Sequence, residues 1–268
     1  MAAEAALYLD HLTAADATPV KLIAAAADAG CAGVCLFLHA MAELPLMPRY
    51  DLVADRAARQ EVQQALMATG MALGLAYPFT LSRRSVIDDF QPGLACAAAL
   101  GARAVNVLCY DRDPVRREDQ LGAFCAAARG FGLKVALEFY PASQVPDLAE
   151  ARRLIAAIGM PGTLGLTVDL LHLMRSGGEP ADLAHVPPQE LFFAQLADGP
   201  LHLPEADWPE EASAERQFLG AGAFDVAGFR AALPAHCPVS VEIPRAADIR
   251  AGVPRAERIA AALAGAMA

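Results

Sequence analysis

The sequence has little positive charge and few aromatic side chains. Among its 268 residues, 21 Lys and Arg stand against 31 Asp and Glu, which gives a net charge of −10, and aromatic residues make up only 6%. Proteins that bind nucleic acid neutralise phosphates with clustered Lys and Arg. The charge balance therefore argues against a nucleic-acid partner, and it also argues against binding to an anionic membrane surface.

Long apolar runs, a basic N-terminal segment and paired Cys-x-x-Cys motifs are also missing. The longest apolar runs have the length of a strand or are interrupted by charged residues or glycine, so no transmembrane helix is expected. Residues 1–10 contain no basic side chain and read as a strand, which argues against a signal peptide.

The cysteines are scattered, mostly in apolar runs where cysteine behaves as a small buried hydrophobe. They are Cys31, Cys35, Cys96, Cys109, Cys125 and Cys237. This pattern fits neither a zinc knuckle nor a disulfide framework. We therefore expect a reducing compartment, hence a cytoplasmic protein.

Short apolar runs alternate along the chain with longer helical patterns. The predicted strands are residues 5–9, 33–38, 71–76, 104–108, 134–138, 163–169, 191–198 and 238–242. The predicted helices are residues 18–29, 51–69, 86–100, 113–130, 146–158, 170–175, 225–233 and 253–267. Such alternation implies parallel strands joined by crossover helices.

Eight units in this length predict a single-domain (β/α)₈ barrel, or TIM barrel, that covers residues 1–268. A doubly wound sheet is the alternative. It would carry a glycine-rich phosphate loop after the first strand, and residues 10–13 do not form one.

Four successive predicted strands end on a side chain with an oxygen ligand. These residues are Glu138, Asp169, Gln195 and Glu242. In a barrel they would share the rim formed by the C-terminal strand ends, where three carboxylates repel one another unless a cation neutralises them. Oxygen ligands favour Mg²⁺ or Mn²⁺, with Zn²⁺ or Co²⁺ left open. Any one acid at a strand end is more often a helix cap or an ion-pair partner.

The motifs around these residues resemble the xylose isomerase-like TIM barrel superfamily. They are Glu138-Phe-Tyr-Pro, Asp169-Leu-Leu-His172 followed by Arg-Ser-Gly-Gly, Ala194-Gln195-Leu-Ala-Asp198 and Val241-Glu242-Ile-Pro. This grouping of sugar phosphate isomerases/epimerases also contains relatives of endonuclease IV and dehydroshikimate dehydratases. The resemblance implies that Glu138, Asp169, Gln195 and Glu242 hold the metal.

The resemblance also implies that His172 and Arg216 contact the substrate. His11 and His39 follow the first two predicted strands, so both are candidates for substrate binding, although each alone is more often structural. Gln195 stands where many isomerases of this grouping carry His, and the turn at residues 219–222 lacks the family proline.

These parts predict a divalent-metal-dependent isomerase or epimerase that acts on a sugar, keto-sugar or related polyol. Glu138 and Glu242 would exchange a proton with the substrate through a metal-stabilised enediolate. The alternative is a lyase of the 3-dehydroshikimate dehydratase or C-glycoside-cleaving kind, which uses the same enolate. Some dehydratases of the grouping carry His two residues after the first Glu, where this chain has Tyr140, so the resemblance implies that this position separates the two chemistries.

A DNA-repair endonuclease and a non-catalytic barrel are further alternatives, and the acidic charge and the ligand set argue against them. The predicted partner is a small molecule. The sequence leaves open the substrate, the metal and whether the chain forms a homo-oligomer.

Overall fold

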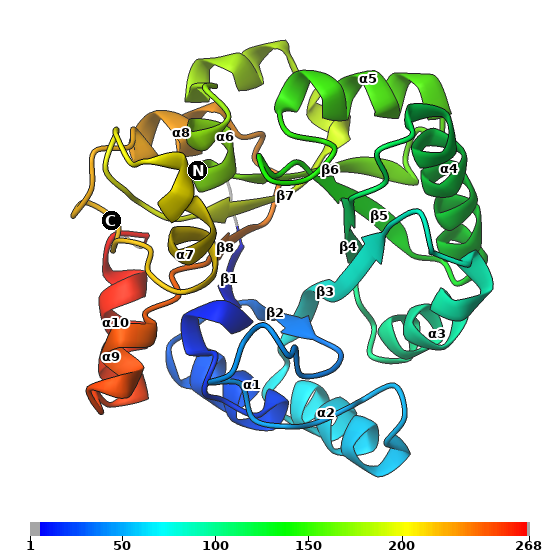
Figure 1. Ribbon diagram of the computed structural model, residues 1–268. Coiled ribbons are helices and arrows are strands. Elements are labelled where there is room, and N and C mark those ends of the chain that lie inside the picture. Colours follow the sequence, from blue (N-terminus) through cyan, green and yellow to red (C-terminus); the bar gives the residue numbers. More distant parts are fainter. Residues whose placement is uncertain (1–5, 267–268) are drawn as a thin grey trace.

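The computed structural model describes residues 6–266 and is a closed barrel of eight parallel strands surrounded by helices (Figure 1). Strands that follow one another in the sequence are paired in space, and β8 closes the ring against β1. The strands are β1 (Leu7–Asp10), β2 (Gly33–Phe37), β3 (Ala72–Leu81), β4 (Ala104–Cys109), β5 (Lys134–Glu138), β6 (Leu164–Asp169), β7 (Leu191–Leu196) and β8 (Val239–Val241). The predicted (β/α)₈ barrel is confirmed.

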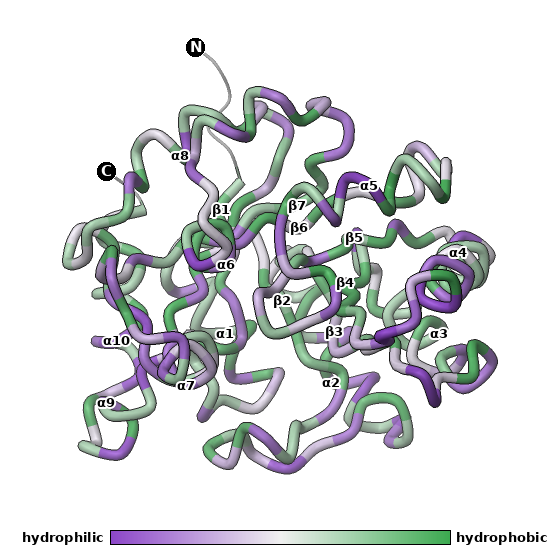
Figure 2. The backbone as a smooth tube through the Cα atoms, turned by 45° about the horizontal axis from the view of Figure 1, so that its top comes forward, coloured by the Kyte–Doolittle hydropathy of each residue, from purple (hydrophilic) through white to green (hydrophobic). Residues whose placement is uncertain are grey.

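Helices cover the outside of the barrel and bury their apolar faces against it. In α4 the buried residues Leu121, Phe124, Cys125 and Ala128 recur at the spacing of one helical face. In Figure 2 the central strands are mainly hydrophobic, whereas α4 alternates hydrophilic and hydrophobic residues. The helices are α1 (Pro19–Asp28), α2 (Arg56–Thr69), α3 (Gln91–Ala99), α4 (Pro114–Gly130), α5 (Leu148–Ile158), α6 (Leu170–Arg175), α7 (Trp208–Ser213), α8 (Val226–Ala232), α9 (Ala246–Arg250) and α10 (Arg255–Ala264).

Aromatic rings fill the interior of the barrel below its rim. Tyr8 of β1 meets Phe193 of β7 edge-on, with ring centroids 5.4 Å apart. Glycines make room for these rings, because a Cβ at Gly74 would lie 2.8 Å from Phe193 and one at Gly33 would lie 2.5 Å from Tyr8. The floor of the barrel is therefore closed by packing, and the open end is the rim of C-terminal strand ends.

Two predicted helices begin later than expected. The segment 51–55 is a turn in which Asp51 accepts hydrogen bonds from Val53 and Ala54, and Asp55 caps α2 at Arg56. The predicted helix 86–100 is divided into a 3₁₀ turn (Ile87–Phe90) and α3. Pro92 accounts for the division, because proline supplies no backbone donor and is tolerated only in the first turn of a helix.

The third strand is longer than the sequence indicated. It runs through Pro78 to Leu81, although residues 77–81 were expected to follow the strand. The peptide bond between Tyr77 and Pro78 is cis, and the register with β4 shifts between Ala76 and Phe79. Pairing with β4 resumes after this irregularity and keeps the segment in the sheet.

Smaller differences concern the C-terminal half. Strand β7 ends at Leu196, before Asp198, and the helices α7 and α9 were not predicted. Residues 5 and 267, which belong to the first predicted strand and the last predicted helix, lie outside the described residues. All six cysteines are free and buried. Within residues 6–266, every helix is too short or too polar to cross a membrane.

Candidate functional site

Four oxygen-bearing side chains meet at the C-terminal ends of β5–β8. Glu138 ends β5, Asp169 ends β6, and Gln195 of β7 pairs with Asp169 in the sheet register. Glu242 follows β8, and its backbone N–H donates to the Leu196 carbonyl at 2.9 Å. All four predicted ligands are buried. The parallel ladder thus brings these side chains into one arc of the rim.

His172 lies between two of these carboxylates. Its Nε2 is 3.6 Å from Glu138 Oε1 and 3.5 Å from Asp169 Oδ2. Asp169 is the N-cap of α6 and accepts from the Leu171 N–H through Oδ1 at 2.7 Å, which leaves Oδ2 for the site. The spacing Asp-x-x-His therefore places both side chains at the same side of the helix start.

Arg216 contacts two of the carboxylates from the segment that connects α7 to α8. Its Nη1 donates to Asp169 Oδ2 at 2.8 Å and lies 3.1 Å from Glu242 Oε2. The side chain is buried, and its Nε donates to the Ala212 carbonyl at 3.1 Å. The guanidinium group is thereby fixed beside the acids and neutralises part of their charge.

Glu138, Asp169 and His172 could hold a metal ion, because they offer one ligand atom each within 4.8 Å of one another. Two buried oxygens nearby, Gln195 Oε1 and Glu242 Oε2, have no hydrogen-bond donor. Glu242 Oε2 is close to Arg216 but outside hydrogen-bonding alignment. Buried acceptors without a donor are unfavourable. Carboxylate, amide and imidazole donors together fit a divalent cation.

Burial raises the pKa of Glu138 to about 8, and the charge of Asp169 adds to the shift. The pKa of Glu242 is raised well above its usual value, first by burial and then by neighbouring acids, against the opposing effect of Arg216. Burial alone would also raise the pKa of Asp169, but Arg216 and His172 outweigh it and lower the pKa. The site therefore combines one ionised carboxylate with two carboxyls that bind protons readily.

A cavity of about 430 Å³ opens above these groups. Its lining includes Glu138, His172, Gln195, Arg216 and Glu242, whereas Asp169 is not part of the lining. The remaining lining residues are Leu12, Phe37, Met41, Glu43, Leu44, Tyr77, Pro78, Phe79, Thr80, Asn106, Leu108, Tyr110, Tyr140, Pro209, Ala212 and Ser213. Tyr140 packs on His172 with ring centroids 4.7 Å apart.

Sequence reasoning missed Asn106 and Thr167, which support Glu138 from the two neighbouring strands. Thr167 Oγ1 of β6 donates to Asn106 Oδ1 of β4 at 2.6 Å, and Asn106 Nδ2 donates to Glu138 Oε2 at 2.5 Å. All three are buried. A polar residue within the apolar run 104–109 was the available signal for Asn106.

Asp10 and Tyr77 form a second buried polar pair that sequence reasoning missed. The Tyr77 hydroxyl donates to Asp10 Oδ2, and the Leu12 N–H donates to Asp10 Oδ1 at 2.9 Å. Burial raises the pKa of Asp10 to about 6, against these hydrogen bonds. Because Tyr77 lines the cavity, the pair connects the wall of the cavity to the end of β1.

His11 does not line the cavity. The Phe37 N–H donates to its Nδ1 at 3.4 Å, and its Nε2 lies 3.1 Å from the Ala17 carbonyl. These partners suit a neutral ring with the proton on Nε2. Tyr50 stacks on the ring with centroids 6.0 Å apart. His11 therefore contacts three segments: the end of β2 at Phe37, the segment before α1 at Ala17, and the loop after β2 at Tyr50.

His39 also lies away from the cavity lining. It pairs with Asp51 in an isolated antiparallel bridge, and its Nδ1 is 3.2 Å from the Ala40 carbonyl. This bridge brings the ends of the loop 39–51 together. The substrate-binding roles of His11 and His39 thus remain predictions from the sequence.

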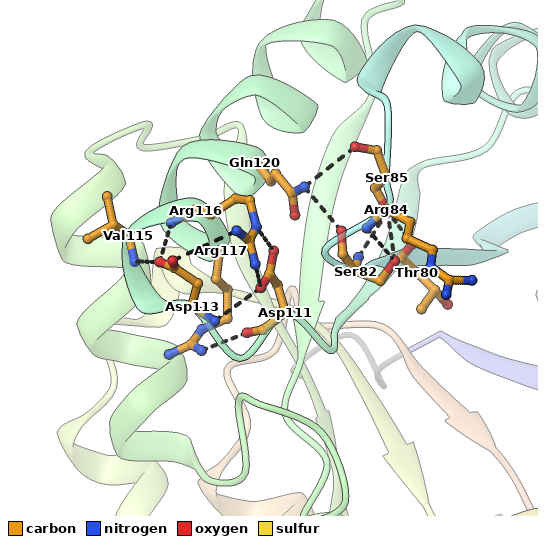
Figure 3. Close-up of polar contacts among 10 residues, drawn as sticks. All are labelled: Thr80, Ser82, Arg84, Ser85, Asp111, Asp113, Val115, Arg116, Arg117 and Gln120. Atoms are coloured by element: carbon orange, nitrogen blue, oxygen red, sulfur yellow. Dashed lines mark hydrogen bonds and ion pairs between the residues drawn. The ribbon is translucent and has the colours of Figure 1, made fainter.

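Polar contacts brace the loops that follow β3 and β4 (Figure 3). Gln120 of α4 donates to the Ser82 carbonyl at 3.1 Å. Arg116 forms a two-bond ion pair with Asp111, and Arg117 donates to the Asp111 carbonyl at 2.9 Å. These bonds tie the segments after β3 and β4 to α4, next to Thr80 and Tyr110 of the cavity lining.

Comparison with known proteins places this geometry in a family. A family model described as xylose isomerase-like TIM barrel matches residues 23–265. The chain belongs to the xylose isomerase-like TIM barrel family. That family is an enzyme superfamily, and curated 3-dehydroshikimate dehydratases are similar to part of this chain.

Individual family members resemble the chain to different extents. The 3-dehydroshikimate dehydratase of Pseudomonas aeruginosa is 32% identical over 136 residues, which are 49% of this chain and 21% of that protein. A xylose isomerase-like TIM barrel/4-hydroxyphenylpyruvate dioxygenase fusion protein has a TM-score of 0.80 at 24% identity. The match covers 98% of this chain and 42% of the fusion protein. The IolI protein, solved with a bound zinc atom, has a TM-score of 0.77 at 18% identity, and the match covers 97% of this chain and 96% of the IolI chain. The two solved structures share the fold.

Proposed function

We propose that the chain is a divalent-metal-dependent isomerase or epimerase of a sugar, keto-sugar or related polyol. The observation that carries the proposal is the pair of buried carboxyls Glu138 and Glu242, which flank the centre of Asp169, His172 and Arg216. Two such groups at the two ends of one arc can remove a proton from carbon and return it elsewhere.

Each side chain has a role that follows from its surroundings. Glu138 binds Asn106 through Oε2 and presents Oε1 to the site, so it can exchange a proton with the substrate through this oxygen. Asp169 stays ionised and, with Glu138 and His172, would hold the cation. A bound divalent cation would polarise a substrate carbonyl and make the adjacent C–H more acidic. Arg216, held beside the acids, orients substrate oxygens by donating hydrogen bonds.

Glu242 lies at the far end of the arc from Glu138, since β6 and β7 separate their strands. Its Oε2 accepts no hydrogen bond within the protein, so this oxygen is available to a cation or to a proton of the substrate. Glu138 and Glu242 are therefore the proposed acid–base pair.

A lyase is the second candidate, and it is supported by the similarity to a 3-dehydroshikimate dehydratase. The same carboxyl that removes the proton would then protonate a leaving hydroxyl group. The matched stretch covers 21% of that relative, so its substrate is a proposal for this chain.

The two candidates are separated by incubating Mn²⁺-loaded protein in D₂O with a panel of ketoses and with 3-dehydroshikimate. Nuclear magnetic resonance should show solvent deuterium beside the carbonyl of a recovered ketose or its epimer. Loss of a hydroxyl group with a new conjugated absorbance would instead identify the lyase. E138Q and E242Q should each lose about 100- to 10,000-fold in rate.

Glu257→Gln provides the matched control, because Glu257 is an exposed acid of α10. It should turn over as the unsubstituted protein does. Full activity of the Glu242→Gln variant would remove Glu242 from the acid–base pair.

A further inference from the structure

Helix α7 forms part of the cavity wall beside Arg216, and its place depends on a single buried side chain. Pro209, Ala212 and Ser213 of this helix line the cavity. The helix has 6 residues, which is too short for stability without tertiary contacts. Among the described residues of α7, Glu211 alone is buried. An ionisable side chain therefore holds this helix, in place of the apolar stripe that holds α4.

Glu211 is bound by Arg175, the last residue of α6. Arg175 Nε donates to Glu211 Oε2 at 2.7 Å, and Nη2 donates to Oε1 at 2.6 Å. Both side chains are buried, and the guanidinium carbon lies 5.2 Å from the centroid of the Phe224 ring. Nη2 also donates to the Pro200 carbonyl at 2.8 Å. Two parallel bonds fix the orientation of the pair, so it fixes α7 relative to α6.

The residue after Glu211 contacts Arg216 directly. The Ala212 carbonyl accepts from Arg216 Nε at 3.1 Å, while Nη1 of the same guanidinium donates to Asp169 Oδ2 at 2.8 Å. Asp169 is the N-cap of α6, and Arg175 ends that helix. The contacts therefore form a closed ring, which runs from α6 through the ion pair to α7, then to Arg216 and back to the start of α6.

We propose that Arg175 and Glu211 are positioning residues, which keep Arg216 directed at the carboxylates of the site. If α7 moved away from α6, the Ala212 carbonyl would move with it, and Arg216 Nε would lose its acceptor. The guanidinium would then be held through Nη1 alone. The effect on the reaction, a poorer orientation of substrate oxygens, rests on the proposed function. The effect on the position of Arg216 does not.

The test replaces both partners of the pair, because a single apolar substitution would leave a buried charge without its partner. Arg175→Met combined with Glu211→Met removes both charges, and apolar replacements of buried ion pairs are often neutral for stability. This double variant should therefore fold with the stability of the unsubstituted protein. Glu211→Gln, which preserves the length of the side chain and one acceptor oxygen, is the second variant.

The nitrogen-15 signal of the Arg216 Nε–H reports the guanidinium in the metal-free protein. Its loss in the spectrum of Arg216→Met assigns the signal. A buried and hydrogen-bonded N–H exchanges slowly with water, so the exchange rate measures how firmly the group is held. The rate should rise about 10-fold or more in R175M/E211M, and it should rise by less in Glu211→Gln.

Trp208 reports the position of α7 independently. It is the only tryptophan of the chain and the first residue of α7. Met174 and Arg175 of α6 line the same surface cavity as Trp208. Separation of α7 from α6 should therefore expose the indole in R175M/E211M, shift its emission to longer wavelength and increase its quenching by acrylamide.

A similar ion pair across the barrel from α7 provides the matched control (Figure 1). Arg117 of α4 donates to Glu150 Oε1 of α5 at 2.9 Å and to the Asp111 carbonyl at 2.9 Å. Like Arg175, it thus binds one glutamate and one backbone carbonyl. Arg117→Met combined with Glu150→Met should leave the exchange of the Arg216 signal unchanged, as well as the emission of the tryptophan.

Slow exchange of the Arg216 signal in R175M/E211M and Glu211→Gln would overturn the inference, and so would an equal increase in the control variant. These readings need neither a metal ion nor turnover. If E138Q and E242Q showed that the proposed acid–base pair is wrong while the Arg216 signal responded as expected, the positioning of Arg216 would stand.

Turnover in the D₂O assay gives a further comparison, in which the pair is removed with and without Arg216. R175M/E211M should lower kcat/KM in the unsubstituted protein and should lower it no further in the Arg216→Met background, because the pair acts through Arg216. Equal losses in the two backgrounds would show that the pair acts on the reaction by another route.

Discussion

Asn106 Nδ2 donates a 2.5 Å hydrogen bond to Glu138 Oε2 across the β4–β5 pair. Thr167 fixes the orientation of this amide, because its hydroxyl donates to Asn106 Oδ1 at 2.6 Å. One oxygen of Glu138 is therefore occupied, and Oε1 faces His172. This arrangement decides which oxygen of the proposed acid–base residue is free for a cation or a proton.

Asn106→Leu should lower the free energy of unfolding by about 1–3 kcal/mol, because it leaves a buried carboxyl oxygen without its donor. Thr167→Val should lower the free energy of unfolding by about 1 kcal/mol, because the buried amide oxygen of Asn106 loses its hydrogen-bond donor. Urea unfolding of both single variants and the double variant measures their coupling. The double variant should lose less than the sum, since Thr167 acts on the carboxyl through Asn106. Strict additivity would contradict the network, and Thr167→Ser is the control that retains the hydroxyl.

Arg216→Met should destabilise the metal-free protein by about 3–5 kcal/mol, because it removes the partner of buried carboxylates. Added Mn²⁺ should then raise the melting temperature more in this variant than in the unsubstituted protein, since the cation replaces the lost positive charge. Differential scanning calorimetry with and without Mn²⁺ measures both effects. The matched control is Arg153→Met, which removes an ion pair at the surface with Glu150 and Glu118 and should cost about 1 kcal/mol or less. Equal losses in the two variants would show that the charge of Arg216 is not needed in the site.

Gln195→Leu should leave the stability of the metal-free protein unchanged or higher, because Gln195 Oε1 is buried without a donor. Its stabilisation by Mn²⁺ should be smaller than that of the unsubstituted protein. At a concentration of about 100 times the Kd, a bound ion stabilises by about 2.7 kcal/mol. Thermal unfolding in EDTA and in graded Mn²⁺ distinguishes the two effects. An unchanged response to Mn²⁺ would show that Gln195 is not a ligand.

Titration of His11 should destabilise the protein as the pH falls from about 6.5 to about 4, whereas the raised pKa values of Asp10, Glu138 and Glu242 act in the opposite direction. Burial lowers the pKa of the His11 imidazole from 6.5 to about 4 in the folded protein. In that pH range His11 binds a proton in the unfolded chain and not in the folded chain, so its contribution to the free energy of unfolding decreases as the pH falls. This group contributes about 3 kcal/mol to the change and nothing further below the folded pKa.

Chemical unfolding at a series of pH values, compared with His11→Gln, isolates this contribution. The variant retains a side-chain amide as a donor to the Ala17 carbonyl but cannot titrate, so between about pH 6.5 and about pH 4 its free energy of unfolding should change by about 3 kcal/mol in favour of the variant relative to the unsubstituted protein. The same slope in both proteins would mean that His11 does not titrate as its burial requires.

The sequence alone predicted the barrel and the rim of acids. Strand and helix periodicity and helix caps are local properties; Asp113, for example, caps α4 by accepting hydrogen bonds from Val115 and Arg116. Since parallel strands end on the same side of a barrel, Glu138, Asp169 and Glu242 had to lie near one another. The order of residues was sufficient for that conclusion.

Only the tertiary structure decided how these groups are used. The support of Glu138 by Asn106 and Thr167, the contact of Arg216 with Asp169 and the displacement of His11 from the cavity depend on side-chain directions. Such directions are set by partners distant in the sequence, and hydrogen bonds between buried polar groups select among rotamers that local patterns leave equally open.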